Sequence, residues 1–227
     1  MSKRGKKYVE AAKLVQVGKA YEPSEAVKLL KQMPARKFDM SVEVHMKLGV
    51  DVKQANQQVR GSTVLPHGLG KTKRVAVFCE DAKASEAKAA GATIVGGEEL
   101  IKEIQTTGKC DFDVAVATPE IMKKMAPIAK ILGQKGLMPN PKTETITNDI
   151  AKTVENLNKG KVSFKTDATA NIHQMIGKIS FDEQKILENF NALLEVVRRV
   201  KPAGAKGIYI RSCTLNVSMG PGVRVKV

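Results

Sequence analysis

Hydrophobic and polar residues alternate strictly over residues 41–48, which is the clearest pattern in the chain. Every second residue there is apolar, and the residues between them are polar, so the pattern predicts a strand with one buried and one exposed side. The residues on the apolar side are Val42, Val44, Met46 and Leu48. Further strands are predicted at 172–179 and 207–218, and a shorter one around Val162 and Phe164.

Helical patterns accompany these strands. A first helix is predicted over residues 6–18, and a second between Pro23 and Pro34, because proline suits the first turn of a helix and not its interior. A third is predicted from Asp182 to about Val200, with acidic residues at its start and basic residues at its end, as the helix dipole favours. The residues expected on the buried face of the first helix are Val9, Ala12 and Leu14.

The middle of the chain has a different pattern. Short apolar runs, typical of buried parallel strands, alternate there with helical segments. The predicted strands are 74–79, 93–95 and 113–118, and the predicted helices are 82–90, 98–105 and one from Pro119 through Leu132. This order predicts a three-layer, Rossmann-like α/β domain at 68–159, inserted into an α+β domain that residues 1–67 and 160–227 form together.

The charge divides at the same places. The 227 residues include 38 Lys and Arg and 23 Asp and Glu, a net charge of +15. About +13 belongs to residues 1–67 and 160–227, and about +2 to residues 68–159. Such an excess favours a polyanionic partner, and the 42% of hydrophobic residues is enough for a folded core. The domain made from the two ends is therefore the one expected to bind the polyanion.

Several classes of function are excluded by what the sequence lacks. No apolar run approaches 18 residues, so no membrane partner is predicted, and the basic N-terminus lacks the apolar stretch of a secretory signal. The three cysteines form no CxxC pair, which indicates a reducing cytosol rather than a disulfide scaffold or a zinc site. His45, His67 and His173 are too scattered for a metal motif, and His45 is placed on the exposed side of its strand. No catalytic residue, metal or cofactor is predicted.

Two segments resemble phosphate-binding loops without meeting their requirements. Residues 67–72 match the end of such a loop, but Leu65 replaces the required glycine and the segment precedes a strand. Gly97 does open a helix after a strand, yet Glu98 and Glu99 in the first turn would repel a phosphate. An enzyme that uses a nucleotide or sugar phosphate on the α/β domain is therefore a weaker alternative, as is a free-standing RNA chaperone.

Aromatic residues make up only 4% of the chain and tryptophan is absent, which disfavours a platform that stacks single-stranded bases. A folded RNA, bound through its backbone and shape, fits better. Phe38 lies in a basic segment before a predicted strand, and its position alone allows either a core residue or a contact. The glycine-rich segments 131–142 and 218–224 allow either close backbone approach or ordinary turns.

The chain resembles the family of bacterial large-subunit ribosomal protein one, the protein of the mobile ribosomal stalk, from about residue 4 to residue 225. Several motifs in unbroken order carry this resemblance. They are Lys37-Phe38-Asp39, Ser41-Val42-Glu43, Leu48-Gly49-Val50-Asp51, Val59-Arg60-Gly61, Leu65-Pro66-His67-Gly68-Leu69-Gly70-Lys71, Val95-Gly96-Gly97-Glu98, Ile131-Leu132-Gly133 with Lys135-Gly136-Leu137-Met138-Pro139-Asn140-Pro141-Lys142, and Ser218-Met219-Gly220-Pro221.

The resemblance implies an RNA-binding domain made from both chain ends and an inserted Rossmann-like domain. It implies binding to a folded element of large-subunit rRNA in the large subunit. It also implies a lateral stalk that contacts and helps release deacylated exit-site tRNA, and repression of translation through the protein's own operon mRNA. The protein would be cytoplasmic and ribosome-bound, and a monomer when free.

The resemblance also implies the contact residues. The main RNA contacts are expected at Lys37, Phe38, Glu43, Ser218, Met219 and Gly220, and secondary ones at Lys71, Lys73, Arg74, Lys135 and Lys142. The family often has threonine at the position of Ser218, but serine also offers a hydroxyl. Gln134 stands where proline or a basic residue is common, so no role is expected of it. We expect Gly220 to allow close approach of the RNA, which a valine would block.

Overall fold

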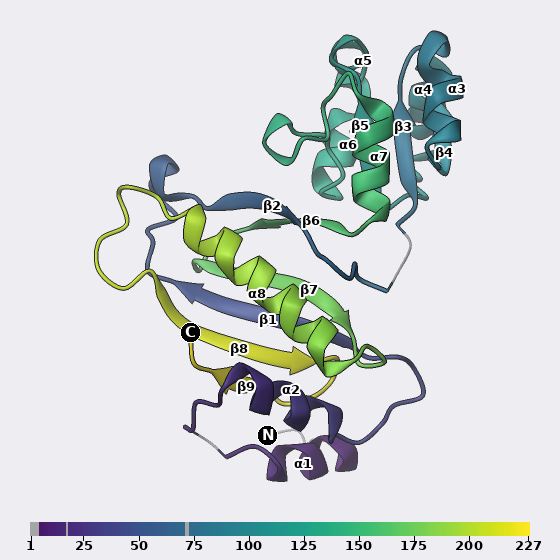
Figure 1. Ribbon diagram of the computed structural model, residues 1–227. Helices are drawn as coiled ribbons and strands as arrows, with labels where there is room; N and C mark the ends of the chain where they lie inside the picture. Colours follow the sequence, from purple (N-terminus) through teal and green to yellow (C-terminus); the bar gives the residue numbers. More distant parts are fainter. Residues whose placement is uncertain (1–4, 17, 71–72) are drawn as a thin grey trace. The chain divides into compact units, whose positions relative to one another are not determined.

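The computed structural model describes residues 5–16, 18–70 and 73–227 (Figure 1). It contains two compact units. One comprises the chain up to Gly70 together with Val162–Val227, and the other comprises the segment between them. We call these the two-ended unit and the inserted unit. The chain therefore passes between the units twice, close to the positions at which the charge divides.

The two-ended unit is built on a four-stranded antiparallel sheet with the strand order β7-β1-β8-β9. These strands are β1 (Ser41–Leu48), β7 (Asn171–Lys178), β8 (Ile210–Val217) and β9 (Val223–Val225). A separate two-stranded sheet pairs β2 (Arg60–Val64) with β6 (Lys161–Lys165). The helices are α1 (Lys6–Lys13), α2 (Pro23–Lys31) and α8 (Glu183–Arg199), with a 3₁₀ turn η1 at Ala55–Gln57.

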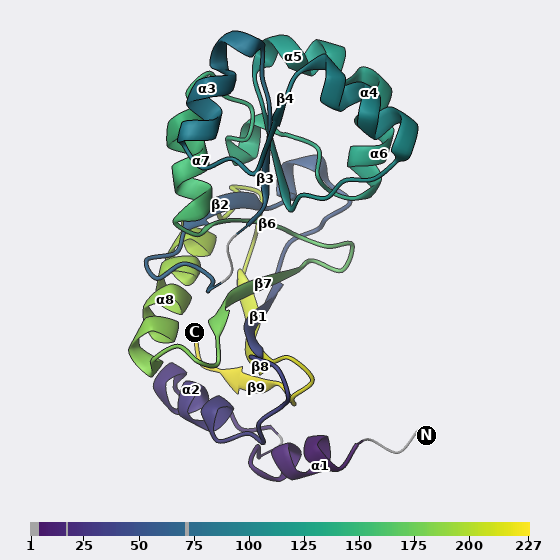
Figure 2. The ribbon, with the colours of Figure 1, turned by 90° about the vertical axis from the view of Figure 1, so that its right-hand side faces the viewer.

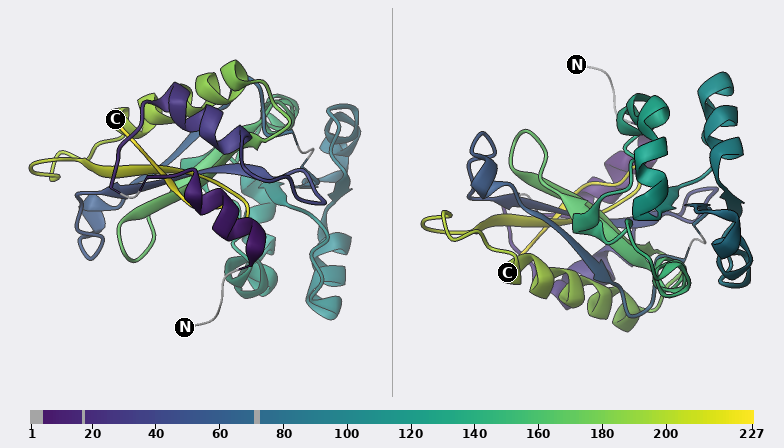
Figure 3. Two further views of the ribbon diagram at one scale, coloured as in Figure 1. Left: turned by 90° about the horizontal axis from the view of Figure 1, so that it is seen from below. Right: turned by 90° about the horizontal axis from the view of Figure 1, so that it is seen from above.

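Helices α2 and α8 lie on the same face of the four-stranded sheet (Figures 2 and 3). The apolar side of β1 is fully buried beneath them, in one core with Leu30 of α2 and Phe190 of α8. This arrangement follows from the alternation in β1, because burying one side of a strand leaves every second side chain on the opposite face. A bulge between Val42 and Glu43 shifts the register between β1 and β7.

The predicted strand at 41–48 is confirmed with the same bounds, and α8 has Asp182 as its N-cap and Val200 as its C-cap, as predicted. The first helix was predicted too long, since α1 ends at Lys13. Its predicted buried face is also wrong. Val9 is 46% exposed and Leu14 is 39% exposed, and Ala11 is the residue of α1 that packs into the core.

The inserted unit has a three-stranded parallel sheet with the order β4-β3-β5. Its strands are β3 (Val75–Phe78), β4 (Ile94–Gly96) and β5 (Val114–Ala117). The helices are α3 (Asp81–Ala89), α4 (Glu98–Thr107), α5 (Pro119–Lys124), α6 (Ala129–Gln134) and α7 (Ile150–Asn158), with 3₁₀ turns η2 (Ala126–Ile128) and η3 (Pro141–Thr143).

Two separate hydrophobic clusters, one on each face of this sheet, confirm the three-layer α/β prediction. Ala76 and Phe78 of β3 pack with residues of α4, α5 and α6, whereas Val75 and Val77 pack with residues of α3 and α7. Every residue of β3 is buried, because helices cover both faces of the central strand. The fold thus combines an α+β unit with a Rossmann-like α/β unit.

The helix predicted from Pro119 through Leu132 is interrupted in the structure. It consists of α5, the 3₁₀ turn η2 and α6, with Pro127 inside the 3₁₀ turn. Proline has no N–H to donate and clashes with the preceding turn, so a continuous helix would be destabilised there. The predicted apolar residues still face the core, and Ile121, Met125, Ile128 and Leu132 are all buried. The elements β2, β9 and α7 were not predicted.

Candidate nucleic-acid interface

The face of the four-stranded sheet opposite α2 and α8 carries polar side chains. We call it the open sheet face. It is defined by Ser41, Glu43, His45 and Lys47 of β1, by Asn171, His173 and Met175 of β7, and by Ser212, Thr214 and Asn216 of β8. Most of these residues are partly exposed, and none is phenylalanine, tyrosine or tryptophan. Such a face offers hydrogen-bonding groups rather than stacking platforms.

Two loops meet at the end of this face where β1 begins and β8 ends. The Phe38 loop comprises residues 34–40, and the Met219 loop comprises residues 218–222. The backbone N–H of Ser41 donates to Oγ of Ser218 at 3.2 Å, and the N–H of Ser218 donates to the carbonyl oxygen of Ser41 at 3.0 Å. The structure therefore joins two predicted contact segments that lie 177 residues apart in the sequence.

Further hydrogen bonds hold the two loops. Nη2 of Arg36 donates to the carbonyl oxygen of Met219 at 3.3 Å, so a side chain of one loop reaches the backbone of the other. Nζ of Lys178 donates to the carbonyl oxygen of Asp39 at 3.2 Å, and the Asp39 carboxylate accepts from the hydroxyl of Ser180 at 2.8 Å. Arg36 and Lys178 were not predicted as site residues, because their role depends on contacts across the sheet.

Met219 adopts a strained backbone conformation. Its φ is +63°, in the left-handed region, within a turn closed by the N–H of Gly220 donating to the carbonyl oxygen of Val217 at 2.7 Å. A residue other than glycine costs about 1–2 kcal/mol there. The Met219 side chain is 70% exposed, and Phe38 is 47% exposed, so both large apolar side chains face solvent. Strain beside exposed apolar side chains is typical of a binding site.

The structure gives Gly220 a different role from the one expected. A Cβ added at this position would lie 2.6 Å from Cγ2 of Val217, 3.1 Å from its carbonyl oxygen and 3.3 Å from Sδ of Met33. Glycine is therefore required by packing inside the Met219 loop. The expectation that a side chain here would block the RNA is corrected, because the added atom points at the protein.

Glu43 lies in the middle of the open sheet face, opposite Met175 on one side and Asn216 on the other. Its side chain is 38% exposed, and Oε2 lies 3.7 Å from Nε2 of His45. Oδ1 of Asn216 is buried without a hydrogen-bond partner among the described residues. The exposed Glu43 carboxylate accepts hydrogen bonds, so this part of the face suits a ligand that brings donors.

The structure brings together two histidines that seemed unrelated in the sequence. His45 and His173 are directly opposite in the β1–β7 ladder, and their Nδ1 atoms are 2.7 Å apart. Nε2 of His173 lies 3.4 Å from Oδ2 of Asp167. Burial, and then the charge of His173, lower the pKa of His45. The sequence predicted both strands but not the register between them, so it could not show that these two histidines meet.

Asp167 organises the turn that precedes β7. Its Oδ1 accepts from the backbone N–H of Asn171 at 2.7 Å and from that of Thr169 at 2.8 Å. The backbone N–H of Asn171, together with Thr169, holds the pKa of the Asp167 carboxyl well below its usual range. Nζ of Lys47 donates to the carbonyl oxygen of Thr169, which ties this turn to the C-terminal end of β1.

The predicted secondary contacts belong to the inserted unit or to its edge. Lys71 lies outside the described residues, and Lys142 falls in η3, its side chain being outside the described part. Nζ of Lys73 donates to the carbonyl oxygen of Lys161 at 2.6 Å, and burial lowers the pKa of Lys73. Arg74 pairs with Asp113 at 3.5 Å, and Nζ of Lys135 donates to the carbonyl oxygen of Gly108 at 2.8 Å. The last three side chains each bind an acceptor within their own unit.

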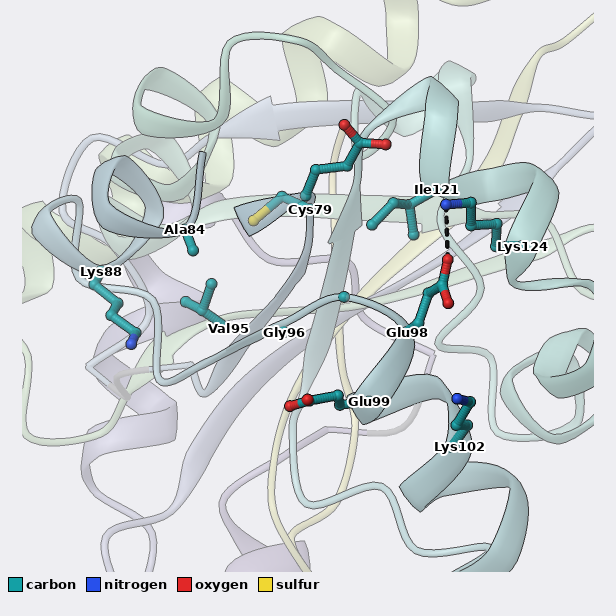
Figure 4. Close-up of a pocket in the computed structure, with 12 residues that line it drawn as sticks. Cys79, Ala84, Lys88, Val95, Gly96, Glu98, Glu99, Lys102, Ile121 and Lys124 are labelled. Atoms are coloured by element: carbon teal, nitrogen blue, oxygen red, sulfur yellow. Dashed lines mark ion pairs between the residues drawn. The ribbon is translucent and has the colours of Figure 1, made fainter. Parts of the chain in front are cut away.

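The inserted unit has a cavity of about 770 Å³ that includes the carboxyl ends of β3 and β4 (Figure 4). Open α/β sheets often bind ligands in this position. Glu98 and Glu99 occupy the first turn of α4, as predicted, and Nζ of Lys124 pairs with Oε1 of Glu98 at 2.7 Å. The charged residues that line the cavity are Glu80, Glu98, Glu99, Lys88, Lys102 and Lys124. The balanced charges and the acidic first turn disfavour a phosphate.

Among the residues that the structure describes, no group of three or more histidine, cysteine or acidic side chains could hold a metal ion. No helix among the same residues has the length and apolarity needed to cross a bilayer.

The fold and the site together define a class of protein. One unit is an α+β unit that both chain ends build, with a polar sheet face and a basic loop at its end. The other is an α/β unit without phosphate-binding chemistry. This combination is typical of a protein that binds folded nucleic acid. Residues 29–221 match the sequence model of the ribosomal protein L1p/L10e family, and the chain belongs to this family.

Curated relatives agree with this assignment. Proteins named large ribosomal subunit protein uL1 from Corynebacterium glutamicum strain R and from a second strain of that species are each 52% identical to the chain over 225 residues. The alignment covers 99% of this chain and 95% of each relative. The predicted resemblance is confirmed. Membership places the chain among structural RNA-binding proteins of the ribosome and not among enzymes, so the enzyme alternative is wrong.

Proposed function

We propose that the chain binds a folded element of large-subunit rRNA through the open sheet face and the two loops at its end. The observation that carries this proposal is the joining of the Phe38 and Met219 loops by reciprocal hydrogen bonds between Ser41 and Ser218. The joined loops present two exposed apolar side chains beside Arg36 and the exposed Lys37. A site that is already ordered loses little conformational entropy when it binds.

The chemistry of the face suits RNA better than DNA. Glu43 is acceptor-only when ionised, so it would repel a phosphate but would accept a hydrogen bond from a ribose 2′-hydroxyl or a base amino group. The Ser218 hydroxyl accepts from Ser41 and keeps its own hydrogen available to donate. Lys37 supplies the salt-sensitive attraction to the RNA backbone. Acceptors in the middle of the face and cations at its end thus serve different parts of one RNA.

The finer roles come from the family resemblance, and the division into two units supports them. The two-ended unit would remain on the rRNA of the cytoplasmic large subunit, while the inserted unit forms a mobile lateral stalk that contacts exit-site tRNA and helps release it. Two crossings of the chain between compact units favour a hinge. A segment of the protein's own operon mRNA that folds like the rRNA element would bind the same face, and translation of that mRNA would be repressed. Secondary contacts at Lys71, Lys73, Arg74, Lys135 and Lys142 stay a prediction.

Sedimentation through a sucrose gradient tests the ribosomal location. A tagged copy of the full chain, expressed in bacteria, should migrate with the large subunit and remain there when the salt is raised to levels that remove loosely bound proteins. The Gly133→Val variant serves as a control, because an added Cβ there would have no heavy atom within 4 Å. Migration at the top of the gradient, with RNA binding retained, would favour the free RNA chaperone instead.

A further inference from the structure

The contact between His45 and His173 constrains how many protons the two rings hold. Their Nδ1 atoms are 2.7 Å apart and the ring centroids 5.0 Å apart. At this separation one Nδ1 must carry a hydrogen and donate it, and the other must accept it. If both Nδ1 atoms carried hydrogens, the two N–H groups would point at each other, so the contact would break.

The neighbouring acids assign the tautomers. His173 directs Nε2 at the Asp167 carboxylate, 3.4 Å away, so this nitrogen carries a hydrogen. In neutral His173 the Nδ1 is then the acceptor, and it receives the hydrogen of His45 Nδ1. Nε2 of His45 is consequently bare in the neutral pair, and it lies 3.7 Å from the Glu43 carboxylate. One further proton has a place at this nitrogen without breaking the contact.

We propose that His45 and His173, joined by the hydrogen bond between their Nδ1 atoms, take up one proton when RNA binds the open sheet face. The proton is added at Nε2 of His45. This inference rests on the proposed function of that face. The pair makes RNA affinity depend on pH, and it links β1 to the turn at Asp167.

The surrounding charges explain the direction of the effect. On β1 the pair is flanked by Glu43 and Lys47, and the ammonium of Lys47 is engaged with the carbonyl oxygen of Thr169. From β7 and its preceding turn the facing groups are His173 and Asp167, while β8 places the uncharged Thr214 opposite His45. An incoming RNA adds negative charge beside Glu43. An imidazolium at His45 would offset that repulsion.

The sign of the pH dependence follows from linkage. In the free protein, burial and His173 lower the pKa of His45 below its ordinary value of 6.5, so neutral His45 dominates at pH 7.5. RNA favours the protonated form and raises this pKa. The association constant for RNA therefore increases as the pH falls, by up to about tenfold per pH unit between the two pKa values, since one proton is taken up.

The experiment measures filter binding of the full chain to deproteinised large-subunit rRNA between pH 5.5 and 8.0 at constant salt. The wild type should bind about three- to tenfold more tightly at pH 5.5 than at pH 7.5. In His45→Asn the amide N–H can still donate to His173 Nδ1, but the side chain cannot take up a proton. This variant should show no such increase between pH 7.5 and pH 5.5, whatever its affinity at pH 8.0.

The matched control is His67→Asn. His67 belongs to the same unit and pairs with Glu188 of α8, away from the open sheet face. It should retain the wild-type pH dependence. Equal pH dependence in the wild type and His45→Asn, or an equal loss of affinity by His45→Asn at every pH, would overturn the inference while leaving RNA binding intact. Absence of rRNA binding by the wild type at all pH values would instead overturn the proposed function.

Discussion

The open sheet face and the cavity of the inserted unit are opposite kinds of candidate site. The cavity is concave, lies at a position favoured by ligands of α/β folds, and comes from one continuous stretch of chain. The open sheet face and its loops come from both ends of the chain and include strained Met219. Only the second combines exposed cations, an exposed carboxylate and backbone strain. Shape and fold alone do not identify a site, because function depends on the groups placed there.

Charge makes the same distinction. In the cavity Lys124 is paired with Glu98, so the cation is neutralised by an acid of the same cavity. At the joined loops, Arg36 donates to a backbone carbonyl of the Met219 loop and keeps its positive charge uncompensated by an acid in that contact. A polyanion gains from the second arrangement and little from the first.

The largest effect is expected from Gly220→Val. The added side chain would meet Cγ2 of Val217 at 2.6 Å, so Val217 or the Met219 loop must shift. We expect stability to fall by about 1–3 kcal/mol, as for other overpacked sites, and rRNA affinity to fall by at least about tenfold. Thermal unfolding and filter binding measure the two effects. Gly133→Val, whose Cβ meets nothing within 4 Å, should change neither strongly.

Met219→Gly separates binding from folding at the same loop. Glycine tolerates the positive φ of this position, so stability should change by no more than about 1 kcal/mol. Loss of the exposed side chain should still weaken rRNA binding severalfold. Unchanged affinity in a stable Met219→Gly protein would mean that the Met219 side chain does not contact the RNA. Only the backbone of this residue would then contribute to the interface.

A smaller effect is expected from Lys37→Ala. If Lys37 neutralises one phosphate, the slope of log affinity against log salt should become shallower by about 0.7–0.9. Lys102→Ala, which removes a cation from the cavity of the inserted unit, should leave that slope unchanged. If the slope changed equally in both variants, the open sheet face would not attract RNA electrostatically more than the cavity does.

No effect is expected when nucleotides are offered to the cavity. A nucleotide present at a hundred times its dissociation constant would stabilise the protein by about 2.7 kcal/mol, which a thermal-shift assay detects easily. Millimolar ATP or GTP should leave the melting temperature of the full chain unchanged. Stabilisation that Glu98→Gln increases would show that the acidic first turn weakens an existing phosphate site.

Local patterns predicted the regular parts of this fold well. The alternation over 41–48 depends on one strand and one buried side, so β1 was predicted with its correct bounds. Predictions were less good where competing contacts decide. Leu14 lies beyond the end of α1 and is 39% exposed although its spacing fits a buried face, and Pro127 interrupts a segment whose apolar spacing is helical throughout. Strand β9 has only three residues, and β2 has a single apolar side chain, Val64, so neither carries a periodic signal.

By itself, the amino-acid sequence determined the interrupted two-domain order, the excess of positive charge at both chain ends and the resemblance that named Lys37 and Met219 as contacts. These properties reside in local spacing, composition and motifs. Only the tertiary structure decided that Ser41 bonds Ser218, that Gly220 is required by Val217, and that His45 meets His173. Each of these depends on strand register and loop geometry, which bring together atoms from distant parts of the chain.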